Sequence, residues 1–192
     1  MRIIGGMAKG RTLNFPAGSK DRPTSDFLRE ALLNLLGDVV DKLFLDLFAG
    51  SGSVGLEAAS RGAKEVCFIE KDKILASIAQ KNIDSCGFEN KCRVINADVR
   101  SGLSDLCKKN CKFDIVFADP PYNKGLVETT IKLLKKYPVF FNEDALIVIQ
   151  HSTREDLNSV LAESVSGETV WQQIDQRKYG DNAISFLKVE QK

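Results

Sequence analysis

One stretch of the sequence decides the fold: Asp46-Leu47-Phe48-Ala49-Gly50-Ser51-Gly52-Ser53-Val54-Gly55. It holds the glycine spacing G-x-G-x-x-G between an apolar run at 43–48 and a helical pattern over 53–61. Glycines at such a strand-to-helix turn let the backbone closely approach a ligand that contains adenosine. The stretch therefore predicts a cofactor-binding turn. The residues expected to bind the cofactor there are Asp46, Phe48, Gly50, Gly52 and Gly55.

Short apolar runs alternate with helical patterns from residue 42 onward. Such alternation is typical of an α/β protein with a mostly parallel sheet and right-handed helical crossovers. The last two runs are joined by a connection too short for a crossover, so we expect an antiparallel pair at one sheet edge. The expected strands are 43–48, 66–70, 93–97, 114–118, 145–150, 169–177 and 183–189, and the expected helices are 53–61, 72–86, 99–110, 124–137 and 154–162.

The segment before this alternation, residues 1–24, is basic, with five Lys or Arg side chains against one Asp. Gly5 and Gly6 allow a turn with positive φ, so a small β-hairpin or an extended arm is expected there. A basic arm is either a solvated terminus or a surface that contacts phosphates. The charges assigned to such a contact are Arg2, Lys9, Arg11 and Lys20.

A helical pattern follows the arm, so the sequence divides into an arm at 1–24 and one domain at 25–192. Gly37 can end this helix, which should pack on the rest of the domain through its apolar face. Ser25 or Asp26 is available as the helix cap. The expected inward-facing residues are Phe27, Leu28, Ala31, Leu32, Leu35 and Leu36.

Acidic side chains beside the glycine turn narrow the class of cofactor. Glu70, 20 residues after Gly50 at the end of the second expected strand, can accept hydrogen bonds from both ribose hydroxyls. Alternatively, Glu70 is simply a solvated carboxylate at the end of a strand. Asp46 stands four residues before the first glycine, where an acid would repel a pyrophosphate but suits a cationic cofactor.

The pattern D-x-F-x-G-x-G-x-x-G resembles motif I of methyltransferases that use S-adenosylmethionine. In that superfamily the carboxylate at the position of Asp46 acts on the methionine part of the cofactor. The resemblance also implies that Asp98, after the third expected strand, recognises the adenine amine. An aspartate in this position is otherwise an ordinary helix cap.

The fourth expected strand is followed by Asp119-Pro120-Pro121-Tyr122, which is either a rigid surface turn or a loop that binds an exocyclic amine. The lone pair of such an amine is delocalised into its base ring, so the amine must be oriented before it can react. The Asp119 carboxylate and the Pro120 carbonyl can accept its hydrogen bonds, and Tyr122 can stack on a splayed-out base. The acceptors also stabilise the positive charge that grows on nitrogen, without a metal or a covalent nucleophile.

The whole series of motifs resembles the bacterial 16S ribosomal RNA (guanine-N2)-methyltransferase family, RsmD, among the amino-methyltransferases with a D/N-P-P-Y/F motif. It implies a Rossmann-like class I fold with seven strands and an N-terminal hairpin. It implies S-adenosylmethionine as cofactor, methylation of one guanine in the assembled small subunit, an arm that contacts ribosomal RNA, and a pocket bordered by Arg22 and Thr24. The resemblance is carried by residues 1–6, Gly10-Arg11, Arg22-Pro23-Thr24, Asp26, Arg29-Glu30, 46–55, Ile69-Glu70, 119–122 and Tyr179-Gly180.

Other functions share parts of this pattern. A nicotinamide dehydrogenase would explain the glycines and Glu70 but not Asp46 or the loop after the fourth strand. Adenine-N6 DNA methyltransferases and glutamine-N5 protein methyltransferases use the same loop. The DNA enzymes usually need a target-recognition domain for which 192 residues leave little room, and the glutamine enzymes have less need of a basic arm. A non-catalytic RNA-binding assembly factor would be expected to have lost either the glycine motif at 46–55 or the loop at 119–122. Both motifs are intact in this sequence.

The composition excludes several classes of protein. Hydrophobic residues make up 43% and charged residues 28% of the chain, unlike a disordered, collagenous or coiled-coil protein. The apolar runs are shorter than the ~18 residues of a membrane span, and the N-terminus lacks an apolar signal segment, so we expect a soluble, cytoplasmic protein. A monomer is expected as well. Five cysteines without a C-x-x-C pair favour neither disulfides nor a metal site. His151, the single histidine, has no second titrating group near it in the sequence.

Overall fold

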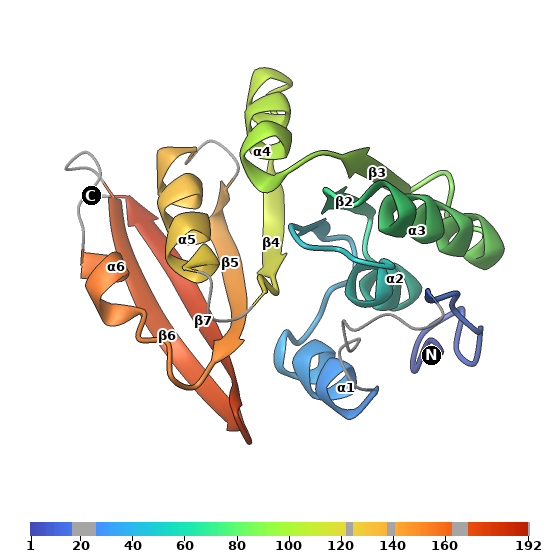
Figure 1. The fold of residues 1–192 in the computed structure, drawn as a ribbon, viewed down its shortest axis with the longest axis horizontal. Coiled ribbons are helices and arrows are strands. Elements are labelled where there is room, and N and C mark those ends of the chain that lie inside the picture. Colours follow the sequence, from blue (N-terminus) through green and yellow to red (C-terminus); the bar gives the residue numbers. More distant parts are fainter. Residues whose placement is uncertain (17–25, 122–124, 138–140, 163–168, 192) are drawn as a thin grey trace. The chain divides into compact units, whose positions relative to one another are not determined.

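The structure is a computed structural model that describes residues 1–16, 26–121, 125–137, 141–162 and 169–191. The chain divides into two compact units, Met1–Asp98 and Val99–Lys192. Figure 1 colours the chain from the blue N-terminal arm to the red C-terminal strands. No helix within the described residues is long and apolar enough to cross a membrane.

The first unit alternates helices and strands as predicted. Its elements are α1 (Asp26–Leu35), β1 (Leu43–Asp46), α2 (Ser53–Ser60), β2 (Glu65–Glu70), α3 (Lys73–Cys86) and β3 (Cys92–Asn96). β2 pairs in parallel with both neighbours, with Glu65 opposite Leu43 of β1 and Val66 opposite Cys92 of β3. Parallel strands joined by helices are therefore confirmed for this unit.

The second unit begins in the same alternation and ends in an antiparallel pair. Its elements are α4 (Val99–Lys108), β4 (Phe113–Ala118), α5 (Leu126–Lys136), β5 (Phe141–Ser152), α6 (Asn158–Ala162), β6 (Thr169–Tyr179) and β7 (Asn182–Gln191). β4 and β5 run parallel, whereas β7 runs antiparallel to both β5 and β6. Only Gly180 and Asp181 connect β6 to β7, and Gly180 has a φ of 61°.

The strands form one seven-stranded sheet in the order β3-β2-β1-β4-β5-β7-β6. β6 is the edge strand, so the predicted antiparallel pair at a sheet edge is confirmed. In such sheets ligands bind beyond the carboxyl ends of the parallel strands. Both the glycine turn after β1 and the Asp119 loop after β4 start at such an end.

The core of each unit is built by strands that are covered on both faces. Phe44 and Leu45 of β1 and Phe68 of β2 are completely buried in the first unit, as are Val116 of β4 and Val148 of β5 in the second. Strands buried on both faces carry continuous apolar runs instead of alternating ones. This explains why these segments are so readily recognised in the sequence.

α1 turns a partly different face inward from the predicted one. Leu28 and Leu32 are buried as expected, but Phe27 is 70% exposed and Leu35 36%. Leu33 is 1% exposed, and Arg29 is completely buried. The prediction assumed that only apolar side chains face the core, whereas an ion pair holds Arg29 inside. The predicted role of Phe27 in packing is therefore wrong.

The helix predicted at 154–162 is shorter than expected. β5 continues to Ser152, and the helix, α6, begins only at Asn158. The side chain of Asp156 accepts a hydrogen bond of 3.0 Å from the N–H of Asn158. Aspartate often binds the backbone in this way outside a helix, which delays the helix start.

The described part of the N-terminal arm folds back on itself through backbone hydrogen bonds between residues 1–3 and 10–13, although it contains no pair of regular strands. A single antiparallel bridge joins Arg2 to Thr12, while Ile3 and Leu13 are 1% and 3% exposed. The N–H of Gly5 donates to a side chain of α2 and not to a partner strand. The arm is therefore attached by contacts with helices, and a solvated terminus is excluded for this part of the chain.

Candidate active site

The chain between β1 and α2 forms the tight turn that the sequence predicts. Gly50 and Gly52 have positive φ angles of 56° and 84°, which other residues rarely adopt. The N–H of Gly52 donates to the carbonyl of Ala49 at 2.7 Å and closes the turn. A Cβ on Gly50 would meet no atom within 4 Å, so this side of the turn is open.

Gly55 differs from the other two glycines in its surroundings. A Cβ on Gly55 would lie 2.3 Å from Cε1 of Phe68 and 2.9 Å from Cγ1 of Val66, both on β2. Helix α2 can therefore lie this close to β2 only because residue 55 has no side chain. The structure places Gly55 in helix–strand packing, a role that the third glycine of such motifs has.

Glu70, the last residue of β2, holds the glycine turn against its strand. The residue is 8% exposed, and its Oε2 accepts a hydrogen bond of 2.8 Å from the N–H of Gly50. Its Oε1 accepts one of 2.7 Å from the N–H of Asp72, the cap of α3. A carboxylate offers about four acceptor positions, so these two bonds leave capacity for ribose hydroxyls.

Asn82 of α3 connects the glycine turn to the N-terminal arm. Its side chain is completely buried, and Nδ2 donates to the carbonyls of Ser51 at 2.9 Å and Asn14 at 3.0 Å. Its Oδ1 accepts a bond of 2.7 Å from the N–H of Asn14. A buried amide with satisfied donors and acceptor fixes the groups around it. The turn and the arm are therefore parts of one hydrogen-bond network.

The other predicted cofactor residues lie at the ends of strands in the first unit. Asp46 is the last residue of β1 and is 2% exposed, and Phe48 is half-buried. Asp98 is exposed and directly precedes α4, where a helix cap would stand. Nδ2 of Asn96 donates to the carbonyl of Glu70 at 2.8 Å and ties the ends of β2 and β3 together.

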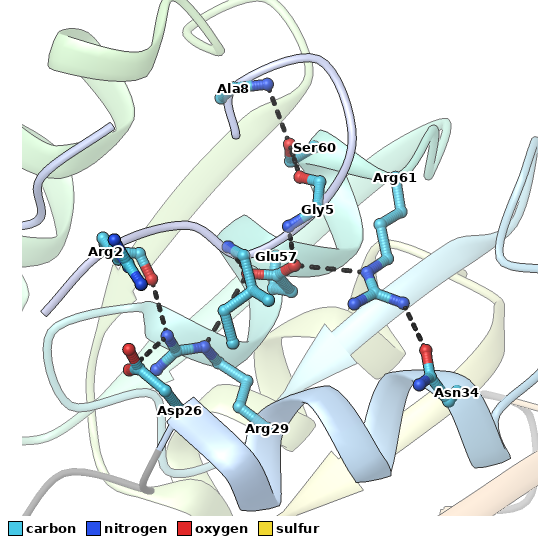
Figure 2. A network of polar contacts seen from close by, with 10 residues as sticks. Arg2, Gly5, Ala8, Asp26, Arg29, Asn34, Glu57, Ser60 and Arg61 are labelled. Carbon is cyan, nitrogen blue, oxygen red and sulfur yellow. Dashed lines mark hydrogen bonds and ion pairs between the residues drawn. The ribbon is translucent and has the colours of Figure 1, made fainter. Parts of the chain in front are cut away.

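Glu57 of α2 is the centre of the contacts that hold the arm (Figure 2). Its two oxygens accept hydrogen bonds from the N–H groups of Ile4 at 2.8 Å and Gly5 at 2.7 Å. Nε of Arg29 lies 3.7 Å from Oε2 of Glu57, and Nη2 of Arg29 donates to the carbonyl of Arg2 at 2.6 Å. Both side chains of this ion pair are completely buried, so the arm supplies bonds that such a pair needs.

The arm is held by its backbone, which leaves its basic side chains at the surface. Oγ of Ser60 accepts a bond of 2.9 Å from the N–H of Ala8 and donates to the carbonyl of Gly5 at 2.6 Å (Figure 2). The exposed cations of the arm are Arg2, Lys9 and Arg11. Three further predicted residues lie outside the described residues, namely Lys20, Arg22 and Thr24.

The predicted catalytic loop starts directly after β4. Asp119 is half-buried, Pro120 is buried and Pro121 is exposed, while Tyr122 lies outside the described residues. Oδ2 of Asp119 accepts a hydrogen bond of 3.1 Å from Nε2 of Gln150 on β5. The loop is thus connected to the neighbouring strand through its acidic side chain.

The predicted site residues fall into two groups. The described cofactor candidates all belong to the first unit, where Glu70 is bonded to Gly50 and Asn82 links the glycine turn to the arm. Asp119, Pro120 and Pro121 belong to the second unit.

Asn82 and Gln150 were not predicted from the sequence. Asn82 lies at helical spacing from the buried Ala79 and beside the buried Ile83, so an amide within an apolar face is the signal that would find it. The partner of Gln150 depends on the register between two strands, which the sequence does not contain.

The remaining titratable candidates are structural. His151 is completely buried, with Nδ1 2.9 Å from the carbonyl of Ser152 and Nε2 2.9 Å from Oγ of Ser185. Burial raises the pKa of the Cys92 thiol to about 12 and keeps it protonated. Among the described residues, no group of three or more His, Cys, Asp or Glu side chains is placed to hold a metal ion.

Known proteins share the sequence of this chain over most of its length. A family model described as "Conserved hypothetical protein 95" matches residues 1–188. Ribosomal RNA small subunit methyltransferase D of Escherichia coli K12 is 37% identical over 189 residues, which covers 95% of this chain and 93% of that protein. The protein of the same name from Haemophilus influenzae is 41% identical over 139 residues, 70% of each chain.

Solved structures share the fold. The Escherichia coli protein YhhF superposes with a TM-score of 0.83 at 33% identity and covers 100% of this chain and 99% of its own. The Thermus thermophilus 16S rRNA N2 G1207 methyltransferase RsmC, in complex with AdoMet and guanosine, gives a TM-score of 0.68 at 23% identity. It covers 92% of this chain and 45% of its own, and the likeness extends to the fold alone.

Proposed function

Because the chain belongs to the ribosomal RNA small subunit methyltransferase D family, we propose that it transfers a methyl group from S-adenosylmethionine to N2 of one guanine in 16S ribosomal RNA. The observation that carries the proposal is the extent of the family match. It spans residues 1–188 and so includes the basic arm, the glycine turn and the Asp119 loop together.

The first unit has the groups that S-adenosylmethionine requires. The turn is open beside Gly50, where a ligand can approach the backbone. Two largely buried carboxylates, Asp46 and Glu70, end the adjacent strands β1 and β2 and suit a cofactor that carries positive charge and ribose hydroxyls. The cofactor would be held by Asp46, Phe48, Gly50, Gly52, Glu70 and Asp98, with Arg22 and Thr24 at its border. When bound, it supplies an electrophilic methyl group on a sulfonium.

The Asp119 loop would receive the target amine. Its carboxylate and the Pro120 carbonyl accept hydrogen bonds from the two amine hydrogens, which orients the lone pair of nitrogen for the reaction. As the methyl group is transferred, positive charge grows on nitrogen, and both acceptors interact with it more strongly. Pro121 stiffens the loop and Tyr122 stacks on the base, so the amine stays in place during the reaction.

The basic arm would bind the substrate RNA outside the reacting nucleotide. Arg2, Lys9 and Arg11 are exposed on a backbone that α2 and α3 hold in place, and with Lys20 they give four charges for phosphates. In this proposal residues 1–24 form the RNA-contacting arm and residues 25–192 the methyltransferase domain. The enzyme acts as a monomer in the cytoplasm on the assembled small subunit.

The test is to incubate the protein with radiolabelled S-adenosylmethionine and, separately, naked 16S RNA, small subunits that lack the modification, duplex DNA and release-factor protein. Label on a guanine N2 of the 16S RNA is expected, with the highest rate on subunits. Label on an adenine N6 or on protein alone would overturn the proposal in favour of the related amino-methyltransferases. Binding of the RNA without any transfer would favour an assembly factor.

The Asp119→Ala variant tests the proposed mechanism directly. Its affinity for S-adenosylmethionine should stay near that of the wild type, while the rate of transfer falls by about 10²–10³, as for other preorganised electrostatic contacts. A single-turnover rate close to that of the wild type would remove Asp119 from the mechanism.

A further inference from the structure

Gln150 stands beside Asp119 because of the register between β4 and β5. These strands are parallel, and the last registered pair of residues is Ala118 opposite Ile149. Asp119 follows Ala118 and Gln150 follows Ile149, so the two residues lie next to each other where β4 ends. Their side chains meet in a hydrogen bond of 3.1 Å, from Nε2 of Gln150 to Oδ2 of Asp119.

The two partners differ in how firmly the fold holds them. Gln150 is 4% exposed, and it lies within β5, where it is paired with Ile184 of β7. Asp119 lies beyond the last residue of β4 and is half-buried. A buried side chain on a paired strand has few alternative rotamers, whereas a side chain after a strand end has more. The fixed partner therefore restricts the orientation of the less constrained one.

A neutral donor suits a carboxylate that must stabilise a developing positive charge. A Lys or Arg at position 150 would also donate to Asp119, but its positive charge would oppose the stabilisation of a cation that develops nearby. The amide of Gln150 holds one oxygen through a hydrogen bond and adds no net charge. The carboxylate still has further acceptor positions for an amine.

We propose that Gln150 is a positioning residue that fixes the orientation of the Asp119 carboxylate for the target amine. The inference rests on the proposed function, because it assumes that Asp119 receives the amine. Gln150 itself need not touch the substrate or the cofactor. Its effect on the reaction should therefore pass entirely through Asp119, and this property can be measured.

Two substitutions remove the hydrogen bond in different ways. Gln150→Met keeps a side chain of similar length without the donor, and Gln150→Asn keeps the amide but shortens its reach by one methylene. For both variants kcat on small subunits should fall by about tenfold to a hundredfold, the loss expected of a misplaced reacting group. The KM for S-adenosylmethionine should not change. A Gln150→Met enzyme with the kcat of the wild type would overturn the inference, since its packing is preserved.

A double-mutant cycle separates positioning from general structural damage. In the Asp119→Ala background, Gln150→Met should cause no further loss of rate, because the group that it positions is absent. Ser185→Ala is the control, since Ser185 is completely buried on β7 and contacts His151 and Gln176. Any loss of rate caused by Ser185→Ala should multiply with that of Asp119→Ala.

The outcomes of this cycle decide both proposals separately. If Asp119→Ala alone has no effect, the proposed role of the loop fails. If Asp119→Ala is impaired but Gln150→Met lowers its rate by a further tenfold, the loop is catalytic and the positioning role is wrong. Thermal melting shows which variants fold, and either Gln150 variant is sufficient for the cycle, so failure of one to fold leaves the other to decide.

Discussion

Asn82 donates a hydrogen bond of 2.9 Å to the carbonyl of Ser51, the residue between the two glycines of positive φ in the glycine turn. The Asn82→Ala variant loses this bond and those to Asn14. We expect a several-fold to tenfold weaker affinity for S-adenosylmethionine, because the turn is then less well fixed before binding. The free energy of unfolding should also fall by about 1–3 kcal/mol, because the carbonyl of Ser51 loses a buried partner. Calorimetric titration and urea unfolding measure the two effects.

Ile83→Val is the matched control for Asn82. Ile83 is the next residue of α3, is completely buried, and makes no side-chain hydrogen bond to the turn. Its truncation should destabilise the protein by about 0.5–1.5 kcal/mol with the affinity for S-adenosylmethionine unchanged. If both variants lose affinity in proportion to their loss of stability, Asn82 has no specific effect on the turn.

Glu70→Ala should weaken the binding of S-adenosylmethionine by about 10²-fold. Each hydrogen bond to a charged group contributes roughly 1.5–3 kcal/mol before water compensates for it, and the variant also loses the bond to the N–H of Gly50. Titration calorimetry measures the loss. Glu65→Ala, at the exposed start of the same strand, is the control and should bind normally.

The observed role of Glu70 in holding the turn can be separated from its proposed role in binding ribose with a modified ligand. S-adenosylhomocysteine should bind the wild type more tightly than its 2′-deoxyribose analogue does. If Glu70 accepts bonds from the ribose hydroxyls, this preference should largely disappear in Glu70→Ala. An undiminished preference would mean that Glu70 only anchors the turn.

Neutralising the arm should weaken RNA binding in a way that depends on salt. Four phosphate contacts predict a slope of log K against log salt of roughly −0.7 to −0.9 per contact, about −3 in total. Changing Arg2, Lys9, Arg11 and Lys20 to Gln should flatten this slope and raise the KM for small subunits. Affinity for S-adenosylmethionine should stay constant, since backbone atoms hold the arm on α2. Filter binding at several salt concentrations provides the slopes.

A control of equal charge comes from the second unit. The exposed residues Lys108, Lys109, Lys112 and Lys136 can be changed to Gln without touching the arm. If this variant loses as much of the salt slope as the arm variant, the RNA responds to total charge and not to the arm.

The single histidine should make the stability of the protein depend on pH. Burial lowers the pKa of His151 below its usual value of 6.5. The unfolded chain therefore takes up a proton as the pH falls through about 6.5, before the folded protein does. The free energy of unfolding should decrease below this pH by at most about 1.4 kcal/mol per pH unit.

His151→Gln removes this group, so the pH dependence between 7.5 and 5.5 should flatten in urea unfolding. Equal slopes in the variant and the wild type would show that His151 is not the cause.

Local patterns in the sequence predicted most of the fold. The buried strands β2 and β4 were predicted to within one residue, because continuous apolar runs between turns are visible without knowledge of partners. The positions of Asp46, Glu70 and Asp119 at strand ends follow from the same pattern. The alternation of helices and strands then places all three at carboxyl ends of strands.

Contacts between distant residues were not predictable. Phe27 was expected inside and Arg29 was not, since only the structure shows that Arg29 meets Glu57 in a buried ion pair. The bond from Gln150 to Asp119 likewise depends on strand register. Buried polar side chains are positioned by partners elsewhere in the chain, and hydrophobic periodicity contains no information about them.

The attachment of the arm has a consequence for the order of folding. The arm is synthesised before its partners, because Gly5 binds Glu57, 52 positions later, and Asn14 binds Asn82, 68 positions later. At about 5–20 residues per second, the ribosome needs roughly 3–14 seconds to cover that second interval. The arm must therefore remain without its partners for seconds on each nascent chain. Docking of the arm can therefore be completed only after both α2 and α3 have been synthesised.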